Sequence, residues 1–130
     1  MNLLDRLFLS GIAMSTLVNA AAPLSGQWGG DRSNLVIDAR GGRIETDCGE
    51  GWINGPIIPN RTGQFVARGH FVVNAGGPEQ MDRVDARKVA TFKGTLSGRS
   101  LTLTVDAPNL SPPRRLTLVK DTQVKLFRCL

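Results

Sequence analysis

Short runs of alternating apolar and polar residues, separated by glycines, fill most of this chain from Leu24 onward. A period of two places successive side chains on opposite faces of a strand, so that one face packs in a core and the other meets water. Glycine between such runs suits tight turns. The pattern predicts about eight sequential antiparallel strands.

The clearest hairpin joins residues 90–96 to residues 99–106 through Ser97-Gly98. Two segments do not fit a tight meander. Residues 74–89 are expected to form a long loop with one or two helical turns, and the proline-rich residues 107–114 are expected to be loop. Loops on a rigid β scaffold often carry binding residues, so both are candidate sites. The expected strands are residues 25–29, 34–39, 43–48, 52–58, 64–73, 90–96, 99–106, 115–119 and 124–129.

These segments predict an all-β fold, in the form of a small antiparallel up-and-down barrel. A β-sandwich is the alternative. We favour the barrel because closure leaves no exposed strand edge. Residues 21–130 are expected to form a single domain.

Residues 1–20 have the pattern of a secretory signal peptide. An apolar run from Leu7 to Val18 follows a short N-terminal region, and Val18 and Ala20 place cleavage after Ala20. The run has roughly 12 residues, whereas a spanning helix needs about 20. We therefore expect a periplasmic or secreted protein that has no transmembrane segment after cleavage.

Export decides how the two cysteines are interpreted, because an oxidising compartment favours a disulfide. Cys48 and Cys129 can form one intramolecular bond, which would close a loop of about 80 residues and stabilise the fold by roughly 4 to 5 kcal/mol. The alternative is two free or intermolecular thiols.

The formal net charge is +5, but the positive residues are scattered along the chain. A solvated basic surface is the simplest interpretation, although basic exported proteins also associate with anionic lipids or acidic partners. The chain has no tyrosine and no basic run interleaved with aromatic residues, so nucleic acid is not an expected partner. We expect a monomer.

Catalytic motifs are sparse. His70 is the single histidine, and neither a Gly-x-Ser-x-Gly elbow nor a Cys-x-x-Cys pair occurs. Paired carboxylates can hydrolyse glycosides across a cleft, but carboxylates at hairpin edges more often serve solubility. We predict a non-enzymatic protein without metal or cofactor, with His70 the one candidate acid or base. The carboxylates cluster at Glu45, Asp47 and Glu50 and at Glu79, Asp82 and Asp85.

The two tryptophans, Trp28 and Trp52, are expected to be structural anchors. In a closed barrel Trp28 would seal one end beneath a guanidinium group, for which Arg128 is the best-placed candidate. Small residues would leave some room inside the barrel for a ligand, namely Ala67, Gly69 and Gly94.

The opening Gly26-Gln27-Trp28 followed by a meander of about eight strands resembles lipocalin and avidin barrels. That resemblance implies small-molecule binding inside the barrel or protein binding at its ends. Leu24-Ser25-Gly26-Gln27-Trp28 also resembles the start of periplasmic inhibitors of bacterial metalloproteases, whose N-terminal trunk enters the protease cleft. Their disulfide is local, whereas the bond expected here reaches the end of the chain.

The whole-chain pattern includes Trp28-Gly29-Gly30, Asp47-Cys48, Gly55-Pro56, Gly76-Gly77-Pro78, residues 92–98 and a closing Arg128-Cys129-Leu130. In this pattern the chain resembles a group of small exported bacterial proteins, which implies a location and a fold but no activity. Our leading hypothesis is a non-enzymatic exported binding module for a small ligand or an envelope partner. The alternative is a periplasmic protease inhibitor of lipocalin-like fold.

Overall fold

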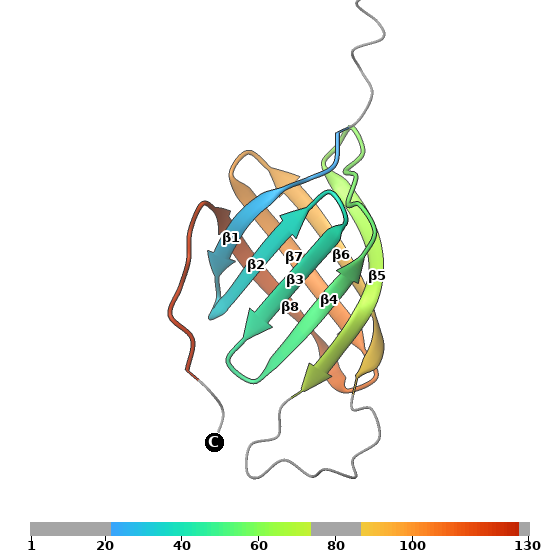
Figure 1. The fold of residues 1–130 in the computed structure, drawn as a ribbon, viewed down its shortest axis with the longest axis vertical. Helices are drawn as coiled ribbons and strands as arrows, with labels where there is room; N and C mark the ends of the chain where they lie inside the picture. The colour runs from blue at the N-terminus through green and yellow to red at the C-terminus, as the bar shows by residue number, and fades with distance from the viewer. Residues whose placement is uncertain (1–21, 74–86, 128–130) are drawn as a thin grey trace, which may run out of the picture.

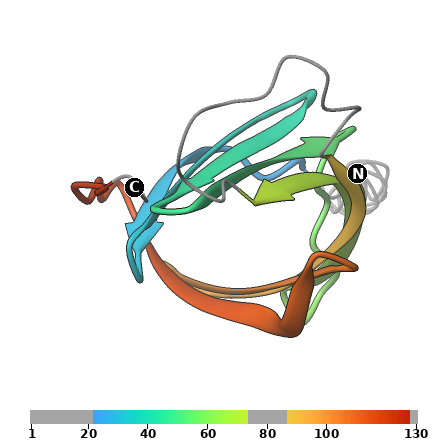
Figure 2. The same cartoon turned by 90° about the horizontal axis from the view of Figure 1, so that it is seen from below.

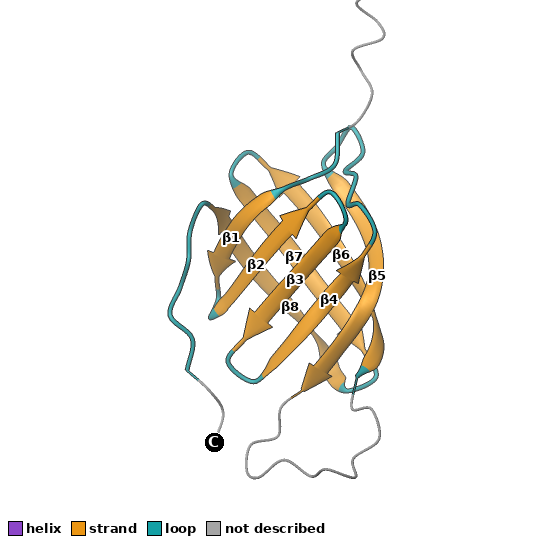
Figure 3. Cartoon of the chain, viewed as in Figure 1, coloured by secondary structure: helices purple, strands orange, loops and turns teal. Residues whose placement is uncertain are grey.

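The computed structural model describes residues 22–73 and 87–127. Within these ranges the chain consists of strands and loops (Figure 3). Eight strands follow one another around a closed antiparallel barrel, and β1 pairs with β8 to complete it (Figure 1). The predicted up-and-down barrel is confirmed, and the sandwich alternative is wrong. The strands are β1 (Gly26–Gly30), β2 (Ser33–Asp38), β3 (Gly41–Thr46), β4 (Gly49–Asn54), β5 (Gln64–Val73), β6 (Lys88–Ser97), β7 (Ser100–Ala107) and β8 (Leu110–Lys120).

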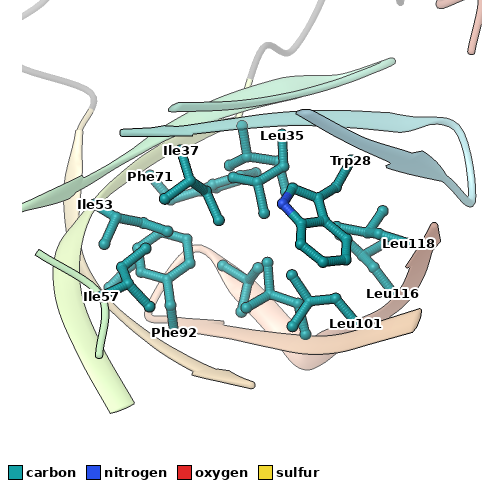
Figure 4. Packing of buried hydrophobic residues seen from close by; sticks show 14 of the residues in the cluster. Trp28, Leu35, Ile37, Ile53, Ile57, Phe71, Phe92, Leu101, Leu116 and Leu118 are labelled. Atoms are coloured by element: carbon teal, nitrogen blue, oxygen red, sulfur yellow. The ribbon is translucent and has the colours of Figure 1, made fainter. Parts of the chain in front are cut away.

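Alternating side chains of all eight strands fill the barrel interior (Figure 4). Leu35 on β2 lies opposite Ile44 on β3, and both side chains are fully buried. Leu101 and Leu103 on β7 are equally buried, as the period of two predicts. Burial of these side chains supplies the main favourable contribution to folding.

Phenylalanine rings cover glycines on neighbouring strands. Phe65 lies opposite Gly94, and a Cβ atom at Gly94 would overlap the Phe65 ring. Phe71 and Gly51 form a similar pair on β5 and β4, where an added Cβ would lie 2.8 Å from Phe71 Cδ1. The interior room expected at Gly94 is therefore occupied by an aromatic ring.

The other two small residues leave no more space than Gly94. A Cβ at Gly69 would overlap the carbonyl oxygen of Trp52, because β4 and β5 approach closely there. Ala67 is half-buried and packs against the core. The interior of this barrel is a packed core at these positions.

Residues 55–63 link β4 to β5 and cover one end of the barrel. Ile57 is 1% exposed, and its carbonyl oxygen accepts a hydrogen bond of 2.7 Å from the backbone N–H of Leu24. The strand predicted over residues 52–58 is therefore displaced along the chain, since β4 begins at Gly49 and ends at Asn54. Gly55 follows with φ 78°, a conformation that ends the strand and suits glycine.

The loop predicted over residues 107–114 is wrong. Ala107 ends β7, and β8 begins at Leu110 after a two-residue connection. A register irregularity between Val105 and Ala107 lies beside this connection. Pro112 and Pro113 are exposed in the same part of β8, and prolines are accepted in strands next to such irregularities.

Residues 121–127, the C-terminal arm, run outside β1 and β2 (Figure 1), and the described part of the strand predicted over residues 124–129, residues 124–127, is not a strand. Asn34 Nδ2 donates to the carbonyl oxygen of Val124 at 2.8 Å, and the Val124 N–H donates to Asn34 Oδ1 at 2.8 Å. The Phe127 N–H donates to Asp47 Oδ1 at 2.8 Å. Side chains of the barrel thus hold the arm by its backbone.

The loop predicted over residues 74–89 is too long, because β6 begins at Lys88. The other expectations for residues 74–86, the signal peptide over residues 1–20, and the roles of Arg128 and Cys129 lie outside the described residues. In the ranges that the structure covers, no helix has the length and apolar character needed to cross a bilayer.

Candidate functional site

Charge is distributed unequally around the barrel. Strands β1 to β4 carry one basic residue, Arg43, against three carboxylates, Asp38, Glu45 and Glu50. Seen along the barrel, β2 to β4 lie on one side and β6 to β8 on the other (Figure 2). Strands β5 to β8 carry a net positive charge, because they contain six basic residues and a single carboxylate, Asp106. The basic residues of β5 to β8 are Arg68, Lys88, Lys93, Arg114, Arg115 and Lys120.

Arg43 on β3 and Glu50 on β4 form an ion pair, and Glu45 leaves these two strands with a net negative charge. Arg43 Nη2 donates to Glu50 Oε2 at 2.9 Å. This hydrogen bond, together with the negative charge of Glu45, raises the pKa of Arg43. By contrast, no described residue forms an ion pair with Lys93 or Arg115.

A groove of about 300 Å³ crosses β5 to β8 where these two cations lie; we call it the outer groove. Val66 is 67% exposed there, whereas its neighbour Phe65 points into the core. The residues that line the outer groove are Gln64, Phe65, Val66, Lys93, Gly94, Thr95, Thr102, Thr104 and Arg115.

Strand register arranges the outward side chains in two rows. The first row contains Val66, Lys93, Thr104 and Arg115 on successive strands. Strands are spaced by nearly 5 Å, so the Cα atoms of Lys93 and Arg115 lie roughly 10 Å apart with Thr104 between them.

The second row is uncharged. It contains Gln64, Thr95, Thr102 and Thr117 on the same four strands. Threonine hydroxyls and the glutamine amide both donate and accept hydrogen bonds. The outer groove therefore offers two cations, several neutral hydrogen-bonding groups and one exposed apolar side chain.

The predicted catalytic candidates do not converge. His70 lies on β5 opposite Val89 and is half-buried. Glu45 and Glu50 lie directly opposite each other on β3 and β4, not across a cleft. Asp47 forms an ion pair with Arg32. Glu79, Asp82 and Asp85 lie outside the described residues.

Metal ligands do not cluster in the part of the chain that the structure describes, where no group of three or more His, Cys, Asp or Glu side chains is suitably placed. Such a group would be needed for a protein-held metal site.

Trp28 is buried within the barrel, with 1% of its surface exposed. The ammonium of Lys120 on β8 lies over its ring, with Nζ 6.0 Å from the ring centroid. Arg128, the predicted partner, is outside the described residues. Trp52 is half-buried, and the guanidinium of Arg87 lies 5.8 Å from its ring centroid.

The outer groove was not among the candidate sites predicted from the sequence. The sequence pattern that could have indicated the groove lies in the hairpin of residues 90–106. Polar residues alternate there with core residues, namely Lys93, Thr95, Thr102 and Thr104. The chain matches no protein-family model, no curated protein and no solved structure.

Proposed function

We propose that this protein is an exported, non-enzymatic binding module that holds an acidic polysaccharide in the outer groove. The observation that carries the proposal is the excess of basic residues on β5 to β8, with Lys93 and Arg115 flanking the groove without a described ion-pair partner. Closely placed cations that lack acidic partners attract anionic ligands.

The neutral groups of the groove favour a sugar polymer among anionic ligands. Thr95, Thr102 and Thr104 match the hydroxyl groups of a glycan, and Val66 offers a contact for the apolar face of a sugar ring. A single-stranded nucleic acid would instead require aromatic side chains for base stacking. Phe65, the aromatic residue in the lining, is 7% exposed and belongs to the core.

The interior is filled at Gly69 and Gly94, where room for a ligand was expected, and this favours the external site over a ligand at those positions. Large side chains occupy the inward positions, and the ring of Phe65 covers Gly94. The protease-inhibitor alternative has less support. Gly26 and Gln27, which belong to the segment that resembles the inhibitors, pair with β2 inside the barrel sheet and do not form a separate trunk.

Export and a Cys48–Cys129 disulfide are part of the proposal. The hydrogen bond from Phe127 to Asp47 supports the disulfide, because it brings the chain two residues before Cys129 to the residue next to Cys48. The described residues also include no free cysteine.

Isothermal titration calorimetry of the mature protein with sodium polygalacturonate tests the proposal, with neutral dextran as the control polymer. We expect saturable binding to polygalacturonate that weakens as salt rises, because salt screens exposed charges. Lys93→Glu combined with Arg115→Glu should weaken binding by roughly tenfold or more, equivalent to about 1.4 kcal/mol.

A matched variant, Arg40→Glu combined with Arg61→Glu, changes net charge by the same amount at exposed positions outside the groove. We expect its affinity to stay within about threefold of the original, because only contacts in the groove specify the ligand. Equal weakening in both double variants, or equal binding of dextran, would refute the proposal.

A further inference from the structure

The indole nitrogen of Trp28 is a buried hydrogen-bond donor without a partner. Trp28 is 1% exposed, and its Nε1 atom makes no hydrogen bond in the structure. The nitrogen is directed into the barrel interior (Figure 4). Buried donors are nearly always satisfied in folded proteins, so this atom indicates a place where an acceptor binds.

A second donor lies over the face of the same indole ring. Lys120 is the register partner of Trp28 and shares its face of β8 with the buried Leu116 and Leu118. Its ammonium lies over the indole ring at 6.0 Å and forms no ion pair among the described residues. The nearest carboxylate in sequence, Asp121, pairs with Arg99.

At Gly26 a carbon atom would fit in van der Waals contact with Trp28 and with the end of the Lys120 side chain. A Cβ atom built on Gly26 would lie 3.7 Å from Trp28 Nε1 and 3.6 Å from Lys120 Cε, with no other atom within 4 Å beyond its chain neighbours. Gly26 has φ 110°, which residues with side chains rarely adopt. The backbone conformation at residue 26 thus favours glycine, and a side chain at this position would crowd Trp28 and Lys120.

We propose that this end of the barrel binds a small carboxylate, which accepts hydrogen bonds from Trp28 Nε1 and from the Lys120 ammonium. Both groups are donors only, and a carboxylate is an acceptor only. A water molecule would bring two donor hydrogens of its own, so it matches a pair of donors less well than a carboxylate does. The site is separate from the outer groove, so either proposal can fail without the other.

The test is a titration of the full mature chain with sodium formate at constant ionic strength, followed by the indole N–H signals in ¹⁵N–¹H spectra. The two tryptophans give two indole signals, and Trp52→Phe assigns them. We expect the Trp28 signal to move saturably to lower field while the Trp52 signal stays in place.

Lys120→Met retains an apolar stem over the indole and removes the charge. It should weaken formate binding by roughly tenfold, as expected for loss of a charge-assisted hydrogen bond. Lys120→Arg should retain affinity within about threefold, and Lys93→Met, in the outer groove, should leave it unchanged.

Two results would overturn the proposal. The first is a Trp28 indole signal that does not respond to formate and shows contacts to water alone, which would make the occupant a structural water. The second is equal formate affinity in Lys120→Met and the original protein, which would show that the ammonium is not part of the site.

Discussion

At the scale of single residues, Gly94 determines how the core is filled, because the Phe65 ring occupies the place where a side chain would stand. We predict that Gly94→Ala lowers the free energy of unfolding by about 1–3 kcal/mol, as overpacking of a filled core does. Urea denaturation followed by tryptophan fluorescence measures the change.

Thr95→Ala, at an exposed position next to Gly94, is the matched control and should change stability by no more than about 0.5 kcal/mol. Adding Phe65→Leu to Gly94→Ala should recover part of the loss, since the smaller side chain frees room for the methyl group. A Gly94→Ala variant as stable as the original protein would show that the ring moves aside without cost.

At the scale of elements, the C-terminal arm is attached by side-chain hydrogen bonds instead of a strand ladder. We predict that Asn34→Ala, which removes both bonds to Val124, lowers the free energy of unfolding by about 1–2 kcal/mol. The Val124 amide should exchange with solvent at least roughly tenfold faster, whereas the amides of β7 should keep their protection.

Asn54→Ala changes the same residue type at an exposed position on β4 and serves as the control. Unchanged exchange at Val124 in Asn34→Ala would mean that other contacts hold the arm in place.

Elements with uninterrupted alternation were predictable from the sequence. The strand predicted over residues 64–73 matches β5 at both ends, and the hairpin of β6 and β7 was also expected. The strand conformation of residues 110–114 was not predictable, because Pro112 and Pro113 cannot donate backbone hydrogen bonds and are more typical of loops. The prediction of room for a ligand at Gly94 was wrong for a different reason. The cross-strand register places the Phe65 ring over this glycine, and the register cannot be read from the sequence.

At the scale of the whole molecule, the sequential pairing of β5 to β8 creates the outer groove. Val66 and Arg115 are distant in sequence, but β6 and β7 lie between their strands and place both side chains in one row. Composition reveals the positive charge, but it does not reveal that the charge gathers on β5 to β8. For this reason the sequence predicts the fold class well and the candidate site poorly.

Side-chain hydrogen bonds attach the C-terminal arm to the barrel, and the proposed Cys48–Cys129 bond would add a covalent attachment. We predict that reduction adds the mass of two hydrogens to the intact mature protein. Cys48→Ala combined with Cys129→Ala should lower the free energy of unfolding by about 4 kcal/mol, because a loop of about 80 residues is no longer closed in the unfolded chain. Reductant should destabilise the original protein equally and leave the double variant unaffected. Equal urea midpoints for both proteins without reductant would show that the two cysteines are not joined.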